Sequence, residues 1–206
     1  ACLVGSEMCI RDRYDVIVVS DEIHCDLTKP GTEYIPFASV DDTCRDISVT
    51  CIAPTKTFNL AGLQTAAVYA ENSILHHRMW RQLNTDEVAE PNAFAIQATI
   101  AAFQYGEEWL DELREYVEKN KQYVTEFLQE KIPLIHPVAG DATYLMWLDC
   151  RKITESGRQF VKFIRKTSGL YVSGGNQYGK GGEGFLRVNV ATSKLVVEDG
   201  MQRLYE

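Results

Sequence analysis

The sequence predicts an α/β protein in which a sheet with covering helices is followed by a smaller α+β region. Three observations predict this class: a nearly continuous β-branched run at residues 14–20, long segments whose apolar residues recur every three or four positions, and short strand-like runs between helical segments near the C-terminus. We therefore expect one body built around the first strands and a second, smaller body built from the C-terminal half.

The amino-acid composition and net charge limit the classes of molecule that this protein is expected to bind. The chain has 206 residues, and 21 Lys and Arg against 29 Asp and Glu give a net charge of −8. Its 45% hydrophobic and 24% charged residues are usual for a globular protein and argue against overall disorder. The acidic balance argues against a nucleic acid or an anionic membrane surface as the main partner. No apolar run approaches the roughly 20 residues that span a bilayer.

The first thirteen residues, ACLVGSEMCIRDR, differ from the remainder because they follow neither a helical nor a strand period. Arg11 and Arg13 come after the short apolar stretch, whereas a secretory signal has its basic residues first. We expect residues 1–13 to be a non-native tail, of the kind produced by translated adaptor DNA. A genuine irregular extension is the alternative.

The cysteines outside that segment give no metal-binding pattern. They form neither a CxxC pair nor zinc-finger spacing, so no metal site is predicted. Without a secretory signal, we expect reduced thiols and a cytoplasmic protein. The four are Cys25, Cys44, Cys51 and Cys150.

Three strands are expected in the first body. The run YDVIVVS at residues 14–20 is typical of a strand buried on both faces of a parallel sheet. Two more strands are expected at residues 46–52 and 65–70, with a loop over residues 53–64. Asp21 follows the first strand directly, at the carboxyl edge where open α/β sheets bind ligands.

Helical periodicity dominates the middle of the chain. Asn72 is expected to cap a helix that reaches about Asn84, and a second helix is expected over residues 91–105. Aromatic and apolar residues at three- and four-residue steps predict a long amphipathic helix over residues 109–128. We expect this helix to run from the first body into the second.

The second body is predicted to alternate strands and helices. We expect Phe160, Phe163 and Ile164 to point inward from its first helix, and its glycine-rich stretch to be a flexible loop. The predicted elements are a strand at 143–148, a helix at 156–168, a strand at 170–173, the loop at 174–184, a strand at 185–190 and a helix at 195–205.

Three charged residues are candidates for chemistry. Lys56 lies among small and hydroxylated residues, and it is either a solvated loop lysine or an amine that attacks a carbonyl. Asp21 either caps the next turn or holds a proton on a heterocyclic nitrogen. Arg187 interrupts an apolar strand, so it pairs either with a buried acid or with the carboxylate of a ligand.

Three motifs that contain these residues resemble the pyridoxal-phosphate enzymes of the aspartate-aminotransferase fold, class I/II. They are SDEIHCDL at 20–27, APTKTFNLAGLQ at 53–64 and FLRVNVATS at 185–193. Within that family they are most similar to the cystathionine β-lyases of the MalY/PatB type. The resemblance covers about residue 14 to the end, and the order and spacing of the motifs agree.

The resemblance implies a domain organisation. Residues 14–105 would be the C-terminal part of the large cofactor-binding domain, which has a mostly parallel sheet covered by helices. Residues 106–206 would be the interdomain helix and the small α+β C-terminal domain.

The resemblance also implies roles for single residues. Lys56 would hold pyridoxal phosphate covalently and act as the acid and base at the substrate Cα. Asp21 would pair with the pyridine nitrogen, and Arg187 would bind the substrate α-carboxylate. His24 stands where many aminotransferases have a tyrosine that bonds the phenolic oxygen of the cofactor, and Thr55 matches a hydroxyl position that reaches its phosphate.

Two further positions depart from the aminotransferase pattern. Ala53 stands where many of these enzymes have a serine that binds the phosphate, and Gln64 stands where they have an arginine. The family also carries a phosphate-binding turn, a ring-stacking aromatic and an asparagine upstream of the position of Asp21. Residues 1–20 do not contain these features. We expect the chain to be the C-terminal half of an enzyme about twice as long, which alone binds pyridoxal phosphate weakly and does not turn over.

The implied activity is cleavage of cystathionine or a related cysteine S-conjugate to pyruvate, ammonia and a thiol. A class I/II aminotransferase that passes the amino group to a 2-oxo acid is the first alternative. A catalytically silent regulatory relative is the second. The family further implies a small amino-acid substrate and a homodimer.

Overall fold

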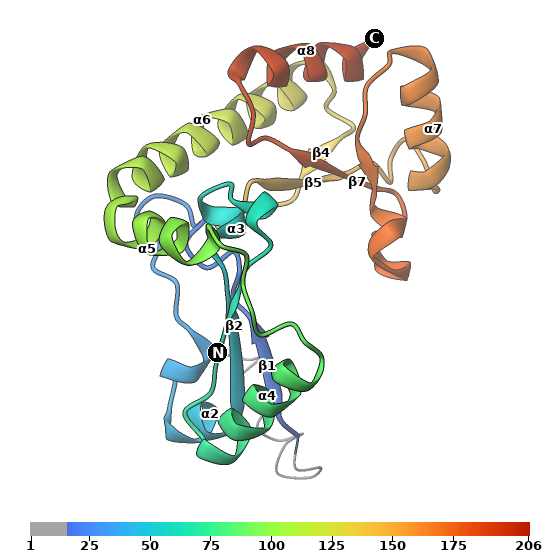
Figure 1. The fold of residues 1–206 in the computed structure, drawn as a ribbon. Helices are drawn as coiled ribbons and strands as arrows, with labels where there is room; N and C mark the ends of the chain where they lie inside the picture. The colour runs from blue at the N-terminus through green and yellow to red at the C-terminus, as the bar shows by residue number, and fades with distance from the viewer. Residues whose placement is uncertain (1–15) are drawn as a thin grey trace. The chain divides into compact units, whose positions relative to one another are not determined.

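The computed structural model describes residues 16–206, which divide into two compact units (Figure 1). Unit 1 comprises the described residues up to Asp26 together with Glu33–Leu110. Unit 2 comprises Leu27–Thr32 and Asp111–Glu206. Both units combine a sheet with helices, which confirms the predicted α/β class.

Unit 1 contains a three-stranded sheet in the order β1-β2-β3, made of β1 (Val18–Asp21), β2 (Ser48–Ile52) and β3 (Ala67–Tyr69). Strands β1 and β2 run parallel, and β3 is antiparallel to β2. The strand expected over residues 14–20 therefore starts later, and positions 14 and 15 lie outside the described residues. All three expected strands of this body have a counterpart.

The expectation that the first strand is buried on both faces is wrong for the described residues. Val19 in β1 has 67% of its surface exposed, whereas its parallel partner Val49 in β2 has 3%. The physical reason is position, because β1 lies at the edge of the sheet that the described residues form and β2 lies between two strands. Hydrophobic sequence alone does not distinguish an edge strand from a central one.

The described part of unit 1 contains four complete helices, of which α2 and α3 lie between strands in the chain and the other two follow β3. Two of the expected helices are present, and Asn72 caps the first of them, because its side-chain oxygen accepts the backbone N–H groups of Ile74 and Leu75. The helices are α2 (Asp42–Ile47), α3 (Pro54–Thr57), α4 (Ser73–Thr85) and α5 (Ala95–Tyr105), with 3₁₀ turns at Phe37–Ser39 and Ala61–Leu63.

Two boundaries in unit 1 differ from expectation. The strand predicted from Asp46 begins only at Ser48, because Asp41 caps α2 by accepting the backbone N–H of Cys44, and that helix continues to Ile47. The segment 53–64 is not wholly a loop. Pro54 occupies the first turn of α3, where its missing N–H costs no hydrogen bond.

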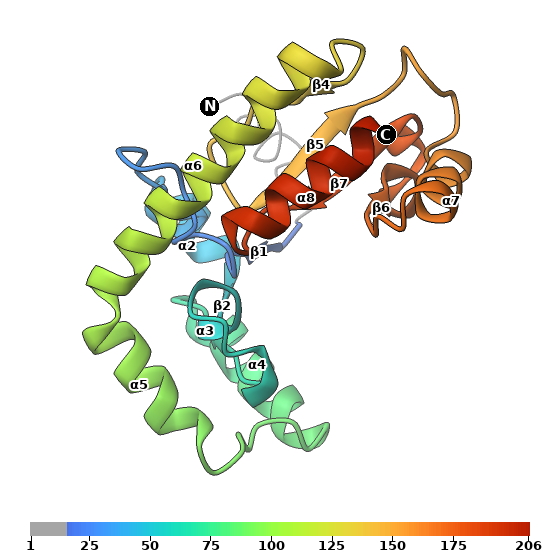
Figure 2. The same ribbon diagram turned by 90° about the horizontal axis from the view of Figure 1, so that it is seen from above.

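Unit 2 is built on a four-stranded antiparallel sheet in the order β4-β5-β7-β6. The strands are β4 (His136–Pro137), β5 (Leu145–Asp149), β6 (Ser173–Gly174) and β7 (Phe185–Asn189), and the helices are α6 (Glu107–Lys131), α7 (Gly157–Thr167) and α8 (Lys194–Tyr205). Helix α6 begins in unit 1 and continues into unit 2. Figures 1 and 2 show α6 and α8 on the same side of the sheet.

The two faces of this sheet have different roles. Met146 and Leu148 in β5 and Leu186 and Val188 in β7 point into the core, because successive side chains in a strand alternate between faces. The core also takes Val117, Val124 and Leu128 from α6, Ile164 from α7, and Val197 and Met201 from α8. The opposite face carries the odd-numbered residues of β5 and β7, which are less buried.

Three details of unit 2 correct the predictions. Phe163 does not point inward, since 63% of it is exposed, because it lies about a third of a turn away from the buried stripe of Phe160 and Ile164. The strand expected over 170–173 includes only Ser173 and continues to Gly174. The expected flexible loop over 174–184 contains two 3₁₀ turns, at Gly175–Tyr178 and Lys180–Gly182.

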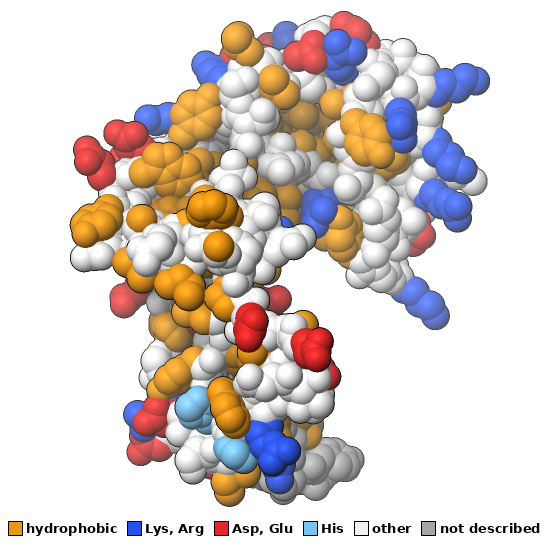
Figure 3. Space-filling model, in the orientation of Figure 1, with side chains coloured by type: hydrophobic (Ala, Val, Ile, Leu, Met, Phe, Trp, Pro, Cys, Tyr) orange, Lys and Arg blue, Asp and Glu red, His pale blue; other side chains and the backbone are white. Residues whose placement is uncertain are grey.

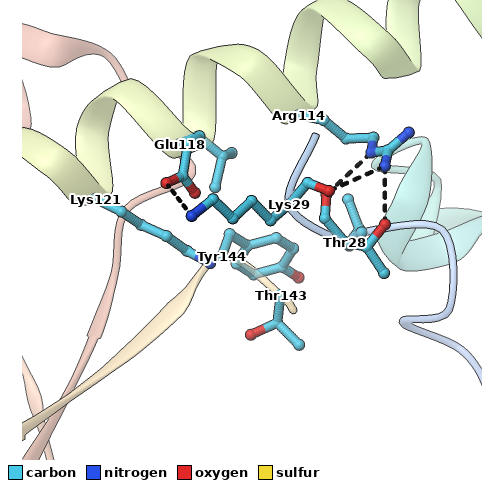
Figure 4. Close-up of a pocket in the computed structure, with 9 residues that line it drawn as sticks. Thr28, Lys29, Arg114, Glu118, Lys121, Thr143 and Tyr144 are labelled. Atoms are coloured by element: carbon cyan, nitrogen blue, oxygen red, sulfur yellow. Dashed lines mark hydrogen bonds and ion pairs between the residues drawn. The ribbon is translucent and has the colours of Figure 1, made fainter. Parts of the chain in front are cut away.

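The segment Leu27–Thr32 is attached to unit 2 by a set of hydrogen bonds (Figure 4). The Arg114 guanidinium in α6 donates to the Thr28 carbonyl and to the Thr28 hydroxyl, both at 2.9 Å. The Lys29 backbone N–H donates to the Asp141 carbonyl at 2.6 Å, and the Lys29 ammonium lies 3.8 Å from Glu118. The residues directly after Asp26 are therefore fixed within unit 2.

No helix among residues 16–206 has the length and apolar character needed to cross a membrane.

Candidate active site

Asp21 and Lys56 are placed by the ends of two parallel strands. Asp21 is the last residue of β1 and stands opposite Cys51 in β2, which ends one residue later. The chain then enters α3, of which Lys56 is the third residue. Because β1 and β2 run in the same direction, their carboxyl ends share one edge of the sheet, where α/β sheets bind ligands.

The pKa of His24 depends on burial and on the charges of Lys56 and Asp21. Burial is the largest cause that lowers the pKa of its imidazole from 6.5, the positive charge of Lys56 lowers it further, and the negative charge of Asp21 acts in the opposite direction. His24 therefore lies within electrostatic range of both Lys56 and Asp21. The lowered pKa favours the neutral imidazole at pH 7.

The carboxylate and the amine are both open to a ligand. Asp21 accepts a single hydrogen bond in the described part of the chain, from the backbone N–H of Ile23 at 3.3 Å. Burial and the charge of Asp21 raise the pKa of the Cys51 thiol, which keeps this neighbour protonated. Within residues 16–206, Lys56 takes part in no ion pair and no side-chain hydrogen bond. A solvated Lys56 and a reactive Lys56 are both compatible with these contacts.

A buried hydrogen bond ties the turn that carries Lys56 to the segment that follows β1. Thr57 is fully buried, and its hydroxyl donates to the Asp26 carboxylate at 3.1 Å. Sequence reasoning missed both residues. The signal was present in the motifs, since Thr57 directly follows Lys56 and Asp26 is the last acidic residue of SDEIHCDL.

Glu22 is a second residue that the sequence analysis did not single out. It is 4% exposed and accepts hydrogen bonds from the Ser20 hydroxyl and from the Phe37 backbone N–H, both at 3.0 Å. Burial first, and the neighbouring Glu22 carboxylate second, raise the pKa of Tyr34 to about 12. Asp21 and Glu22 leave the strand end in different directions, so one is available to a ligand while the other holds the loop that contains Tyr34 and Phe37.

Thr55 precedes Lys56 in α3 and is half-buried. Ala53 occupies the N-cap position of this helix and provides no side-chain cap. An apolar cavity of about 440 Å³ in unit 1 begins beside these residues, and Ala53, Pro54 and Gln64 contribute to its wall.

The groups at this edge fit pyridoxal phosphate in their chemistry. An uncommitted primary amine matches the aldehyde, a nearly uncommitted carboxylate matches the pyridine nitrogen, and a neutral imidazole lies within electrostatic range of both. The donor set does not fit a metal ion as well, because residues 16–206 contain no group of three or more His, Cys, Asp and Glu side chains arranged for one.

Arg187 belongs to unit 2, whereas Asp21, His24, Thr55 and Lys56 belong to unit 1. It lies in β7 on the face away from the core, opposite Trp147 of β5. Its guanidinium carbon lies 4.2 Å from the centre of the Tyr178 ring. No acidic side chain of residues 16–206 forms an ion pair with Arg187, so the first explanation offered for it, a buried acid partner, has no counterpart there.

The fold, a sheet with a lysine-bearing turn at its carboxyl edge joined by a long helix to an α+β unit, defines the class of pyridoxal-phosphate transferase-like proteins. The sequence model of the aminotransferase class I and II family matches residues 8–204, and the chain belongs to that family.

Individual relatives refine this assignment. The chain is 40% identical over 198 residues to cystathionine beta-lyase PatB of Bacillus subtilis, which covers 96% of this chain and 51% of that protein. It is 30% identical to the protein MalY of Escherichia coli, over 98% of this chain and 50% of that one. Among solved structures, cystalysin from Treponema denticola, which contains pyridoxal 5'-phosphate, matches with a TM-score of 0.93 and 28% identity over 98% of this chain and 51% of that one.

These relatives confirm the resemblance that the three motifs predict. The chain spans about half the length of the curated relatives it matches.

Proposed function

We propose that this chain contributes the lysine-bearing side of the active site in a pyridoxal-phosphate-dependent carbon–sulfur β-lyase. The enzyme would cleave cystathionine or a related cysteine S-conjugate to pyruvate, ammonia and a thiol. The observation that carries the proposal is the gathering of Lys56, Asp21 and His24 at the carboxyl edge of two parallel strands. The preference for a lyase rests on the similarity to PatB.

Four residues of unit 1 would hold the cofactor. The Lys56 amine would bind its aldehyde carbon, Asp21 would hold the proton on its pyridine nitrogen, and Thr55 would donate to its phosphate. His24, neutral at pH 7, would contact the ring edge without adding charge. When bound, pyridoxal phosphate supplies an electron sink for the pair of electrons left as a bond to the substrate Cα breaks.

The remaining chemistry belongs to the protein. Arg187 would bind the substrate carboxylate through its two parallel N–H groups and so orient the Cα–H bond. The Lys56 Nζ, once released by the substrate amine, would accept the Cα proton and return it to the departing sulfur. The Cβ–S bond breaks with its electron pair on sulfur, and water converts the remaining three-carbon fragment to pyruvate and ammonia.

Reductive trapping tests the cofactor site on this chain directly. Pyridoxal phosphate is added, the adduct is reduced with borohydride, and the labelled peptides are identified by mass spectrometry. We expect the label on Lys56 in preference to the nine other lysines of the chain. Lys56→Arg should abolish the preferred label, and Lys162→Arg, which changes an exposed lysine of α7, should leave it unchanged. Equal labelling of the exposed lysines would contradict the assignment.

The reaction type is tested on the longest open reading frame that contains this chain. With cystathionine and no 2-oxo acid, release of thiol and pyruvate in equal amounts supports the lyase. A strict requirement for an added 2-oxo acid would show an aminotransferase instead. Lys56→Ala should remove either activity, since both need a base at Cα.

We also propose that the enzyme is a homodimer. Support comes from α5 in unit 1, over which hydrophobic side chains gather on the surface (Figure 3). Phe94, Ile96, Ile100, Phe103 and Tyr105 are each about half or more exposed. Light scattering of the same long product, together with Ile100→Asp, tests this assignment, and a monomer at micromolar concentration would contradict it.

A reducing compartment, the cytoplasm, is the proposed location. It is supported by the cysteines of the described chain, between which no disulfide forms. Burial raises the pKa of the Cys150 thiol to about 12 and that of the Cys25 thiol to about 11, so neither is reactive at neutral pH. Fractionation with an antibody against the chain tests the location.

A further inference from the structure

The exposed face of the unit 2 sheet contains an apolar cavity beside Arg187. We propose that this cavity is the subsite for an apolar, preferably aromatic, substituent of an α-amino acid whose carboxylate Arg187 binds. The inference deepens the proposed function and rests on it for the role of Arg187. The cavity measures about 320 Å³ and is lined by Val138, Trp147, Tyr178, Gly181, Gly182 and Phe185.

Three aromatic rings form the wall. Trp147 in β5 and Phe185 in β7 point to the same face of the sheet, and their ring centres lie 6.3 Å apart at a steep angle. Tyr178 packs edge-on against Trp147, with ring centres 5.4 Å apart. Edge-to-face pairs of this kind hold each other in place, so the wall is preformed.

Two glycines allow the turns beside the aromatic wall to pack closely. A Cβ on Gly175 would lie 2.9 Å from the six-membered ring of Trp147 and would also collide with the carbonyl oxygen of Gly182. The two glycines therefore allow the 3₁₀ turns to approach each other and leave room for the indole. The glycine-rich segment, predicted from sequence as a flexible loop, contributes Tyr178, Gly181 and Gly182 to the wall of this cavity.

Arg187 connects the cavity to a carboxylate site. Its guanidinium lies over the face of Tyr178, while Trp147, its neighbour on β5, faces the same side of the sheet. Val138 and Trp147 also line a larger cavity of about 780 Å³, of which Arg187 forms part of the wall. The two cavities thus share a wall beside the charged group.

The chemistry of the ligand follows from this arrangement. A guanidinium without an acidic partner in residues 16–206 favours a carboxylate, and the rings beside it favour an apolar group a few bonds away. An S-aryl or S-benzyl cysteine carries both a carboxylate and an apolar ring. Tyr178 is a positioning residue, because its ring holds the guanidinium through a cation–π contact.

The test measures binding to the 206-residue chain without cofactor. The chain has three tryptophans, Trp80, Trp109 and Trp147, so ¹⁵N-labelled indole groups give three signals, and Trp147→Phe identifies one of them. S-benzyl-L-cysteine should shift the Trp147 signal in a saturable way and leave the other two in place. S-methyl-L-cysteine, which lacks the ring, and S-benzylcysteamine, which lacks the carboxylate, should bind at least ten-fold more weakly.

Variants separate the charge from the cavity. Arg187→Gln should weaken S-benzyl-L-cysteine at least ten-fold, whereas Arg158→Gln, at an exposed site on α7, should not change its affinity. Val138→Phe should fill the cavity and remove binding. Because Val138 is 50% exposed, this replacement is tolerated by the fold, and an otherwise unchanged amide spectrum verifies that.

Two results would overturn the proposal. The first is that S-benzylcysteamine binds as tightly as S-benzyl-L-cysteine, which would show that Arg187 takes no part in binding at this cavity. The second is no shift of the Trp147 signal by S-benzyl-L-cysteine. Either result is independent of the reductive trapping at Lys56, so the failure of this subsite and the failure of the cofactor assignment are distinguishable.

Discussion

Unit 2 covers one face of its sheet with helices, whereas unit 1 leaves much of its apolar surface exposed in the described residues. The main buried cluster of unit 2 joins three helices to β5 and β7, and it has thirteen members. That of unit 1 has three, Val49, Ala70 and Leu75. In unit 1 the exposed residues include Val19 at 67% and Phe94 at 75%.

The difference shows how each unit fixes its polar residues. In unit 1 the ionisable groups are placed by strand ends and by a few local hydrogen bonds, such as the one from Thr57 to Asp26. In unit 2 a packed core fixes the strand that carries Arg187, and the Tyr178 ring packs against its guanidinium. We expect mutations to act through packing in unit 2 and through local contacts in unit 1.

The largest effect should come from the core of unit 2. Leu148→Ala removes a fully buried side chain and should lower the free energy of unfolding of unit 2 by about 2–5 kcal/mol. Amide hydrogen exchange of β5 and β7 in the variant measures it. Protection equal to that of the wild-type chain would contradict the packing assigned to this core.

A smaller loss of folding stability is expected from a substitution in the sheet of unit 1. Val49→Ala should cost about 2 kcal/mol, because it removes two buried methyl groups and leaves a cavity. Val19→Ala, on the exposed edge strand, is the matched control and should change stability by less than about 0.5 kcal/mol. Urea unfolding compares the two, and equal losses would mean that β1 is as buried as β2.

Loss of the buried hydrogen bond from Thr57 to Asp26 should lower the free energy of unfolding by about 1–2 kcal/mol. Thr57→Val removes the hydroxyl that donates to Asp26 and leaves the carboxylate without it, and Thr57→Ser should restore most of the stability. Protection of the α3 amides against hydrogen exchange and the yield of reductive label on Lys56 should fall together in the valine variant. Loss of stability without loss of label would restrict Thr57 to a structural role.

The smallest effect is a pH dependence in unit 2. Arg151 donates through its side chain and its backbone N–H to Asp149, and lowers the pKa of that carboxyl to about 2. A lowered pKa stabilises the folded state above the unfolded value of about 4, and this contribution is lost as the pH falls from about 4 to about 2. In urea unfolding, the stability of wild type relative to Asp149→Asn should fall over this range, because only wild type has the Asp149 carboxyl. The effect is small because the pair is near the surface.

Much of the candidate site could be predicted from sequence. The β-branched run before Asp21 predicts a strand with a carboxylate at its end, and the order of the three motifs indicates the family. The cap formed by Asn72 is local, so it is also predictable from sequence, and the structure confirms it. The roles of Lys56, Asp21 and Arg187 stay predictions until the trapping and binding experiments are done.

Other features depend on residues distant in sequence. Glu22 and Thr57 look unremarkable in the chain, and only their burial against Phe37 and Asp26 makes them important. The attachment of Thr28 to unit 2 requires Arg114, which lies 86 residues away. No local pattern encodes such pairings.

Sequence alone predicted the α/β class, the existence and approximate order of the main helices and strands, and the candidate residues for the chemistry. Periodicity, caps and motifs depend on residues that are close in sequence, so they can be recognised without a structure. Tertiary structure decided which strand is buried and which residues wall the cavity beside Arg187. Those outcomes depend on what packs against each side chain, and packing is a property of the folded chain as a whole.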